Sequence, residues 1–201
     1  RWLPLLCPSR DLPKPGEAEL VVIDVGQGLS VLVRTARHSL LYDMGPATED
    51  GFDAGDRAVV PAVHALGIRD LDAAMLSHGA TDHAGGWLAV DKAFPVAALL
   101  APAGSPAPGI ANCVAGQSWE WDGVRFRVLH PTPGFPYLGN EASCVLRIET
   151  AHGNALLTGD IGHYVERAML QRDADRLRNE VVIVPHHGSA GSSDAGLLAA
   201  T

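Results

Sequence analysis

The stretch Ala73-Ala74-Met75-Leu76-Ser77-His78-Gly79-Ala80-Thr81-Asp82-His83 decides the fold that this sequence can adopt. Its first five residues are apolar or small, and they predict a buried strand. A polar cluster follows at once, in which His78, Asp82 and His83 stand at the carboxyl end of that strand. Because loops on a rigid scaffold are where ligands converge, the stretch predicts two imidazoles and a carboxylate at one edge of a sheet.

The same stretch has a simpler interpretation as a capping turn. Asp82 is a residue type that caps helix N-termini, and Gly85-Gly86-Trp87 opens a helix that is predicted over 84–93. The stretch alone therefore leaves both a metal site and a capping turn open.

Two further polar clusters follow apolar strands later in the chain. Gly159-Asp160 comes after the strand predicted over 155–158, and His186-His187 comes after the strand predicted over 181–184. Imidazole and carboxylate groups bind zinc, manganese or iron, and Asp160 could bridge two ions. Each cluster alone fits an ordinary turn, but three of them at strand ends predict a metal site. A two-metal site generates hydroxide at neutral pH and stabilises charge on an attacked phosphorus or carbonyl.

The rest of the chain divides into two β-rich halves, each closed by helices. The first three strands follow one another through short turns and predict an antiparallel meander. Two such halves predict two sheets packed face to face with helices outside. The strands are expected at 19–25, 30–35, 38–43, 73–77, 95–100, 118–121, 124–129, 144–149, 155–158 and 181–184, and the helices at 56–66, 84–93 and 163–178.

Composition bounds the class of protein. The chain has 201 residues, 47% of them hydrophobic, which is enough for one domain with a sizeable core. A net charge of −8 argues against nucleic-acid binding through bulk charge. It does not exclude a nuclease, because bound divalent cations change the field that a phosphate meets. No apolar run approaches the roughly 20 residues that cross a bilayer, so we expect a soluble segment. Its opening is no signal peptide, although it could be the tail of a membrane-proximal linker.

Three cysteines are too few for a disulfide scaffold, and their spacing does not match a zinc knuckle. Cys113 and Cys144 could form one bridge in an oxidising compartment, or they could be two separately buried thiols. Sequence leaves these two interpretations open.

The motifs together resemble the metallo-β-lactamase fold, whose superfamily carries a His-x-His-x-Asp-His motif, a later Gly-Asp and a late His. The sequence resembles more closely the C-terminal lactamase-like domain of the ComEC family of DNA-uptake channel proteins of natural competence. The matching segments lie at 24–28, 76–78, 82–86, 140–146, 157–160 and 185–189, so they span nearly the whole chain. The resemblance implies an α/β (α+β) fold: an αββα four-layer sandwich of two mixed sheets with flanking helices. It places a linker at 1–18 and the domain at 19–201, with the domain incomplete at its C-terminus.

Carried over by position, the resemblance implies metal ligands at His78, Asp82, His83, Asp160 and His187. Asp82 and His187 are expected to be catalytic, with Asp82 orienting the nucleophile. A second group is expected to contact the substrate or the ligands: Asp24, Asn140, Ser143, His186 and Ser189. For His186 a packing role is equally open, and for His130 a structural role in a loop is expected.

One departure from the family motif bears on the metal. ComEC relatives usually have Asp where this chain has Ala80, and other superfamily enzymes usually have His there. Since Ala80 cannot bind a metal, one position keeps only His78 and Asp160, whereas the other keeps Asp82, His83, Asp160 and His187. We therefore expect one or two divalent ions, Mn²⁺ or Zn²⁺, with weak occupancy of the first position.

The resemblance implies a metal-dependent nuclease (phosphodiesterase) that degrades the non-imported DNA strand by attack of metal-bound hydroxide. Its expected partners are DNA, as a single strand or an entering duplex, and the membrane channel part of the same polypeptide, with no small-molecule cofactor. The parent would be a bacterial inner-membrane protein with this soluble domain on the periplasmic face.

Alternatives to the nuclease remain open. The domain could bind metal and DNA as a gate without turnover, or it could hydrolyse a small ester or lactam, since the fold hosts many chemistries. Several arginines are candidates for DNA backbone contacts, and a solvated surface paired with acidic residues is the other interpretation. These arginines are Arg34, Arg37, Arg167, Arg172, Arg176 and Arg178.

Overall fold

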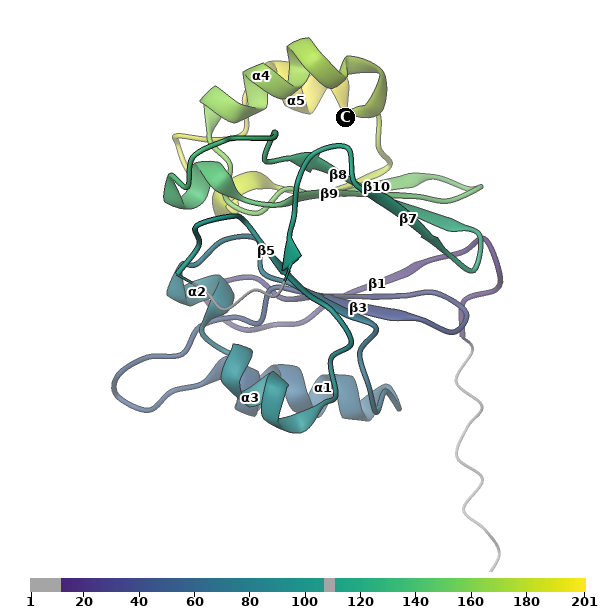
Figure 1. Cartoon of the computed structure of the whole chain (residues 1–201), viewed down its shortest axis with the longest axis vertical. Coiled ribbons are helices and arrows are strands. Elements are labelled where there is room, and N and C mark those ends of the chain that lie inside the picture. The colour runs from purple at the N-terminus through teal and green to yellow at the C-terminus, as the bar shows by residue number, and fades with distance from the viewer. Residues whose placement is uncertain (1–11, 107–110) are drawn as a thin grey trace, which may run out of the picture.

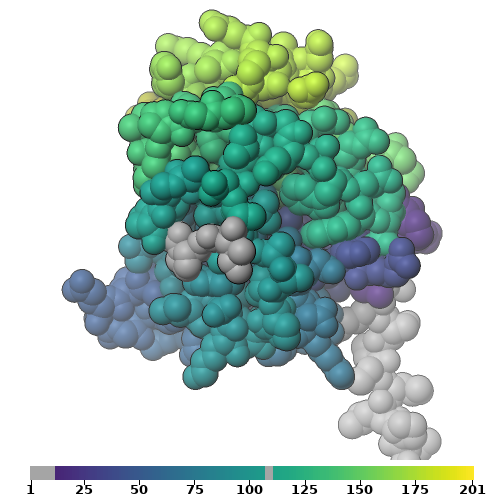
Figure 2. Space-filling view, viewed as in Figure 1, coloured from purple at the N-terminus to yellow at the C-terminus, as the bar shows by residue number. Residues whose placement is uncertain are grey.

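Two β-sheets stack face to face, and helices cover the outer face of each sheet (Figure 1). The computed structural model describes residues 12–106 and 111–201. In the space-filling view the N-terminal half and the C-terminal half meet along the middle of the molecule (Figure 2). This is the four-layer αββα arrangement that the sequence predicts.

The first sheet is mixed, with the strand order β1-β2-β3-β4-β5-β6. The first three strands are antiparallel, as the meander predicts, and the neighbours from β3 onward are parallel. The strands are β1 (Glu19–Val22), β2 (Val31–Arg34), β3 (Ser39–Tyr42), β4 (Ala73–Met75), β5 (Leu99–Ala101) and β6 (Ala111–Asn112).

The second sheet has the order β11-β10-β9-β8-β7 and is also mixed. Its strands β10 and β11 are parallel, and the other neighbours are antiparallel. The strands are β7 (Ser118–Trp121), β8 (Val124–His130), β9 (Val145–Glu149), β10 (Asn154–Leu157) and β11 (Val181–Ile183). Parallel neighbours in both sheets bring several strand ends to one edge, which Figure 1 shows on the side of α2.

Helices pack outside each sheet. A helical turn over Gly55–Val59 continues as α1, and α3 lies beside it against the first sheet. The second sheet is covered by α4 and α5. The helices are α1 (Val60–Ala65), α2 (Thr81–Ala84), α3 (Trp87–Ala93), α4 (His163–Asp173) and α5 (Ala195–Ala200), with single helical turns at Gly139–Ala142, Ala174–Arg176 and Pro185–Gly188.

Apolar side chains fill all three spaces between the four layers. In β2, Val31 and Val33 face the second sheet, whereas Leu32 faces the outer helices. Because such central strands are buried on both faces, they are continuous apolar runs in the sequence. The strands therefore form a rigid frame for the loops at their ends.

Several element boundaries differ from the sequence predictions by a few residues. The helix predicted over 84–93 begins at Trp87 as α3, and a separate short helix, α2, precedes it; Gly85 and Gly86 lie between the two and are too close to other backbone for a side chain. A Cβ on Gly86 would lie 2.2 Å from the carbonyl oxygen of Met44. The strand predicted over 95–100 pairs mainly as β5, and the helix predicted over 163–178 ends as α4 at Asp173.

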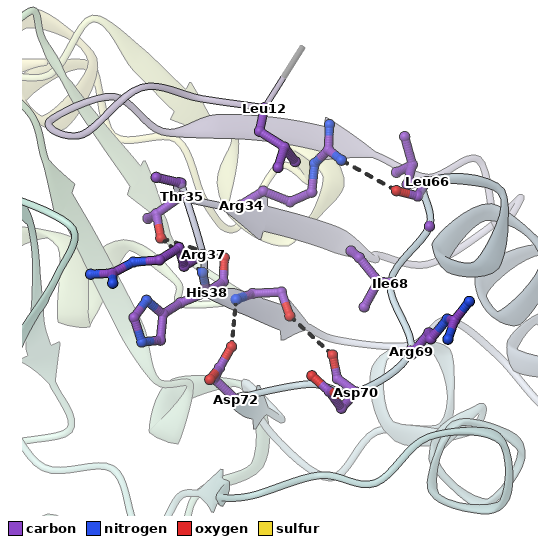
Figure 3. A pocket seen from close by; sticks show the side chains of 13 residues that line it. Leu12, Arg34, Thr35, Arg37, His38, Leu66, Ile68, Arg69, Asp70 and Asp72 are labelled. Atoms are coloured by element: carbon purple, nitrogen blue, oxygen red, sulfur yellow. Dashed lines mark hydrogen bonds between the residues drawn. The ribbon is translucent and has the colours of Figure 1, made fainter. Parts of the chain in front are cut away.

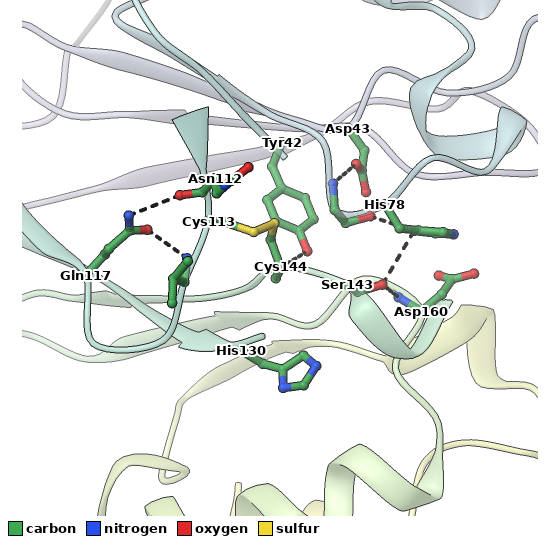
Figure 4. The surroundings of a disulfide bond; sticks show 12 residues. Tyr42, Asp43, His78, Asn112, Cys113, Gln117, His130, Ser143, Cys144 and Asp160 are labelled. Atoms are coloured by element: carbon green, nitrogen blue, oxygen red, sulfur yellow. Dashed lines mark hydrogen bonds between the residues drawn. A yellow bond between two sulfur atoms is a disulfide. The ribbon is translucent and has the colours of Figure 1, made fainter. Parts of the chain in front are cut away.

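A disulfide joins Cys113 to Cys144, with the two Cα atoms 6.0 Å apart (Figure 4). Cys113 follows β6 and Cys144 precedes β9, so the bridge ties the first sheet to the second. The hydroxyl of Tyr42 donates a hydrogen bond to the carbonyl of Cys144 at 2.6 Å, between the sheets. Of the two interpretations that the sequence leaves open, the structure has the bridge.

Two of the arginines that were candidates for DNA contacts, Arg34 and Arg37, lie at the edge of the sandwich opposite α2. The guanidinium of Arg34 is buried and pairs with Glu19, and it also donates to the carbonyl of Leu66 (Figure 3). Arg37 donates from its backbone N–H and from Nε to Asp122. Arg34 is thus a structural ion-pair residue, which corrects its candidacy for DNA contact.

The arginines on and after α4 pair with nearby carboxylates. Arg167 lies 2.7 Å from Asp194, and Arg172 and Arg176 lie within 3.5 Å of Asp173. The structure favours the paired surface over a phosphate-binding patch for these three side chains.

His130, for which a structural role in a loop is expected, is the buried last residue of β8. We predict that this histidine makes the stability of the protein depend on pH. Its Nε2 lies 2.8 Å from the carbonyl of Glu141. Burial, only partly offset by that hydrogen bond, lowers the pKa of His130 to about 4. In the unfolded chain the pKa of this histidine is near 6.5, so as pH falls the unfolded chain takes up the proton before the folded chain does. The contribution of neutral His130 to the free energy of unfolding is therefore present above pH 6.5 and is lost as pH falls toward 4.

The measurement is urea unfolding at pH 7.5 and pH 5.0. The wild-type chain should lose about 2 kcal/mol between these pH values through His130 alone. His130→Gln keeps a donor for Glu141 and should lack that part of the loss. Equal losses in the two proteins would contradict the assignment.

Candidate metal centre

Four side chains from three segments converge at the edge where α2 lies: two from α2, one from the loop after β10 and one from the helical turn after β11. The ligand atoms of Asp82, His83, Asp160 and His187 all lie within 4.8 Å of one another. The Nε2 of His83 is 3.1 Å from Asp160 Oδ1 and 3.2 Å from His187 Nε2. Tetrahedral coordination with bonds of 2.0–2.1 Å would space ligand atoms by about 3.3 Å. The donor set and its spacing therefore fit a divalent metal ion.

A buried carboxylate that sequence analysis missed holds His83 in place. Asp43 Oδ2 lies 2.8 Å from His83 Nδ1, and Asp43 Oδ1 accepts the backbone N–H of Ser77 at 2.7 Å. The contact assigns a proton to Nδ1 and leaves Nε2 facing the other ligands. Asp43 follows β3 with φ of 56°, a left-handed conformation that Asp tolerates. Its place after a strand beside β4 was the available signal.

The charge of His83 is set by its two carboxylate neighbours. Burial opposes protonation of the ring, but Asp43 and Asp160 outweigh it and raise the pKa of His83 to about 10. In turn, although burial opposes its ionisation, contact with His83 lowers the pKa of Asp160. A metal ion must therefore displace a proton from His83, and binding is coupled to proton release.

The loop that carries His186 and His187 has a strained backbone. Both residues have positive φ, 48° and 51°, and the loop is fixed by hydrogen bonds from His186 N to Gly159 O and from Ser192 Oγ to Pro185 O. This conformation directs His187 Nε2 to within 3.5 Å of Asp82 and 3.7 Å of Asp160.

His186 lies at the rim of the cluster. Its Nε2 is 3.3 Å from Asn140 Nδ2 and 3.8 Å from Asp160 Oδ2. The structure thus brings two of the predicted contact residues, Asn140 and His186, together beside the ligands. Ser189, another predicted contact residue, bonds within its own loop, to Ser192 Oγ at 3.3 Å.

His78 lies beside the four-residue cluster. Its ring centroid is 4.4 Å from that of His83, and its Nε2 is buried with no hydrogen-bond partner among the described residues. Burial and the neighbouring His83 lower the pKa of His78. A neutral imidazole with a buried, unpartnered nitrogen suits metal ligation, so His78 fits a second ion position.

Ser143 connects His78 to Asp160 (Figure 4). Its hydroxyl lies 3.4 Å from His78 Nδ1 and accepts the backbone N–H of Asp160 at 3.1 Å. The hydroxyl itself donates to the carbonyl of Asn140 at 2.7 Å. Ser143 therefore contacts two of the predicted ligand residues, the ring of His78 and the backbone of Asp160.

Asp24 and Ala80 lie outside the cluster. The exposed carboxylate of Asp24 accepts the N–H of Gly26 and shapes a turn that packs on the backbone of Asp82, where Leu29 N donates to Asp82 O at 3.2 Å. Ala80 precedes α2, and its carbonyl accepts the N–H groups of His83 and Ala84. Ala80 presents a methyl group where the family motif has a ligand.

The family model described as the metallo-beta-lactamase superfamily matches residues 23–198. The chain belongs to this superfamily. A metallo-β-lactamase domain of this kind is a metal-dependent hydrolase by family, and the superfamily typically binds divalent metals. The match covers every residue of the cluster described above.

Curated relatives of this metallo-β-lactamase domain include competence proteins. Competence protein ComA of Neisseria gonorrhoeae is 39% identical over 182 residues, covering 90% of this chain and 25% of that protein. Recombination protein 2 of Haemophilus influenzae is 32% identical over 191 residues, covering 94% of this chain and 24% of that protein. The chain thus spans about a quarter of these relatives' length. These matches confirm the resemblance to the lactamase-like domain of the ComEC family.

Solved structures confirm the fold. A metallo-β-lactamase with a HARLDQ motif from Cronobacter sakazakii matches with a TM-score of 0.63 at 18% identity, covering 94% of this chain and 88% of that one. A metallo-β-lactamase from Hirschia baltica matches with a TM-score of 0.57 at 16% identity, covering 92% and 96%. At such identities the likeness concerns the fold alone.

Proposed function

We propose that this domain is a metal-dependent phosphodiesterase that cleaves DNA during uptake and degrades the strand that is not imported. The observation that carries the proposal is the convergence of Asp82, His83, Asp160 and His187 within 4.8 Å at an open edge of the sandwich. Similarity to competence proteins supports DNA as the substrate. The Mn²⁺ or Zn²⁺ ion remains a choice for experiment, because histidine and carboxylate ligands suit both.

A divalent ion held by these residues would supply a Lewis acid and an activated water nucleophile. The chain's own residues then divide the remaining work. The side chain of Asp82 is 33% exposed, so its carboxylate can accept a proton from the nucleophile and orient it. His186 and Asn140, at the rim, offer donors for a non-bridging phosphate oxygen.

The two ion positions are unequal in this proposal. One position has four protein ligands, whereas the other has His78 and the shared Asp160, because Ala80 supplies none. We expect the four-ligand position to fill at lower metal concentration and the position of His78 and Asp160 to fill weakly.

The proposed partners are DNA and a membrane channel in the same polypeptide, with the domain on the periplasmic face of the inner membrane. No helix in the described parts of the chain is long and apolar enough to span a membrane.

The Cys113–Cys144 bridge supports an oxidising compartment, since disulfides are rare in the cytosol. A free-thiol count on protein from its native compartment tests this location, and two reduced cysteines would contradict it.

Ala80→Asp tests the function directly. Bound metal and cleavage of labelled single-stranded DNA are measured for this variant and for the wild-type chain with added Mn²⁺ or Zn²⁺. We expect Ala80→Asp to bind a second ion and to cleave about 10- to 100-fold faster, because a ligand is restored.

Ala80→Asn is the matched control, with the same size and no charge, and nitrocefin tests lactam hydrolysis beside DNA. If both proteins bind metal and neither cleaves DNA, the second candidate function applies: a metal-binding domain that holds or gates DNA without turnover. Ala80 is the observation that favours this alternative.

A further inference from the structure

A groove of about 530 Å³ opens beside the metal centre and shares one residue with it. Asp82 lines the groove and also belongs to the ligand cluster. The other walls come from the turn after β1, from the loop after β3 and from the start of α2. They are Val25, Gly26, Gln27, Pro46, Thr48, Phe52 and Thr81.

An exposed aromatic ring stands at this groove. Phe52 is 37% exposed, and the Arg57 guanidinium carbon lies 5.2 Å from its ring centroid. The backbone bonds from Thr48 N to Phe52 O at 2.8 Å and from Gly51 N to Thr48 O at 3.0 Å close the loop that carries the ring. That loop projects from the molecule on the side of α2 (Figures 1 and 2). Arg57 and the closed loop therefore hold the ring in position, and its exposed part is available for stacking.

Charge on the groove disfavours a phosphate there. Asp82 is the acidic residue of its walls, and the loop that carries Phe52 adds four acidic residues beside the groove against one cation, Arg57: Glu49, Asp50, Asp53 and Asp56. The uncharged amide of Gln27 offers donors and acceptor together, which suits the edge of a nucleobase. A polyanion would be repelled from this wall, whereas a flat, uncharged base would be accepted on it.

We propose that this groove binds the nucleobase next to the scissile phosphate, by stacking on Phe52, while the phosphate lies at the metal centre. The inference rests on the proposed phosphodiesterase function, which it deepens by assigning a base subsite. Base–aromatic stacking tolerates every sequence, so this subsite would confer a preference for nucleotides without sequence specificity.

Two chromogenic esters separate the base subsite from the chemistry. Methyl p-nitrophenyl phosphate has the reacting group and no base, whereas the p-nitrophenyl ester of thymidine 5′-monophosphate has both. Phe52→Ala should lower kcat/KM about tenfold for the thymidine ester, in line with the loss of one stacked base, and leave the methyl ester within twofold. Phe52→Trp should keep kcat/KM for the thymidine ester near the wild-type value, because it retains an aromatic ring at this position.

Tyr164→Ala is the matched control, because Tyr164 is an aromatic residue on α4 that is 74% exposed and does not line the groove. It should leave both esters unchanged. Equal losses on the two esters in Phe52→Ala would overturn the proposal, because they would show a general structural effect.

A binding measurement keeps the subsite testable if neither ester is hydrolysed. Fluorescence anisotropy compares a labelled oligothymidylate with an abasic oligomer of the same length. If Phe52→Ala binds the oligothymidylate more weakly than the wild-type chain does and binds the abasic oligomer equally well, the subsite is supported even though the phosphodiesterase proposal has failed. Unchanged binding of both oligomers would overturn the subsite.

Discussion

Asp160→Asn is expected to empty the metal centre and to lower hydrolysis by on the order of 10³-fold. The Asp160 carboxylate is the shared member of the site, 3.1 Å from His83 Nε2, 3.7 Å from His187 Nε2 and 3.8 Å from His186 Nε2. An amide of the same size keeps the packing but removes the negative charge that three imidazoles face. Metal content by elemental analysis and the rate of DNA cleavage are the two measurements.

Asp122→Asn is the control for this prediction. Asp122 is also a buried aspartate with several hydrogen bonds, but it joins Thr35, Arg37 and His38 at the opposite edge of the sandwich. Its substitution should lower stability and leave metal content unchanged. Full metal content in Asp160→Asn would show that the ion is held elsewhere.

Asp43→Asn should weaken metal binding about 10- to 100-fold, although Asp43 lies outside the ligand cluster. An asparagine tolerates the left-handed backbone at this position and can still accept the N–H of Ser77. Its NH₂ group, or its neutral oxygen, would face His83 Nδ1 in place of a carboxylate that lies 2.8 Å away. The ring would lose both its orienting partner and the basicity that the partner confers on Nε2.

Asp72→Asn provides the comparison. Asp72 likewise accepts a backbone N–H, that of Ser39 at 2.8 Å, at the edge opposite the metal centre (Figure 3). Metal affinity, measured by competition with a chromophoric chelator, should fall in the Asp43 variant and stay at the wild-type value in the Asp72 variant. Equal affinity in both would remove the proposed role of Asp43.

The periodic parts of this chain and its strand-end clusters could be predicted from sequence. Alternation and apolar runs give the sheets, because strands buried on one or both faces must be apolar at regular positions. Asp82 and His83 come after β4, Asp160 comes after β10 and His187 comes after β11, so the geometry of sheets brings them to one edge. Local pattern sufficed because their neighbours in space are fixed by strand order.

The groove and the support of the site could not be predicted in this way. Asp43 has the sequence context of an ordinary turn, and its function depends on a contact with a residue 40 positions later. Phe52 lies in an irregular loop, where no periodicity relates it to Gln27 or Asp82. Arg34 had the charge of a DNA contact, and only its contact with Glu19 across β1 and β2 shows that it is structural. Contacts between irregular segments have no sequence period to reveal them.

The left-handed backbone at His186 and His187 sets thermostability against ligation in this domain. The left-handed conformation lowers the free energy of unfolding by about 1 kcal/mol for each of these two residues, compared with a residue in an ordinary conformation. Glycine at either position would recover that energy and would make the protein harder to melt, but glycine at 187 would also delete an imidazole of the cluster. Selection for heat resistance and selection for a filled metal centre therefore favour different residues at 187, and a more heat-resistant engineered variant is best sought outside this loop.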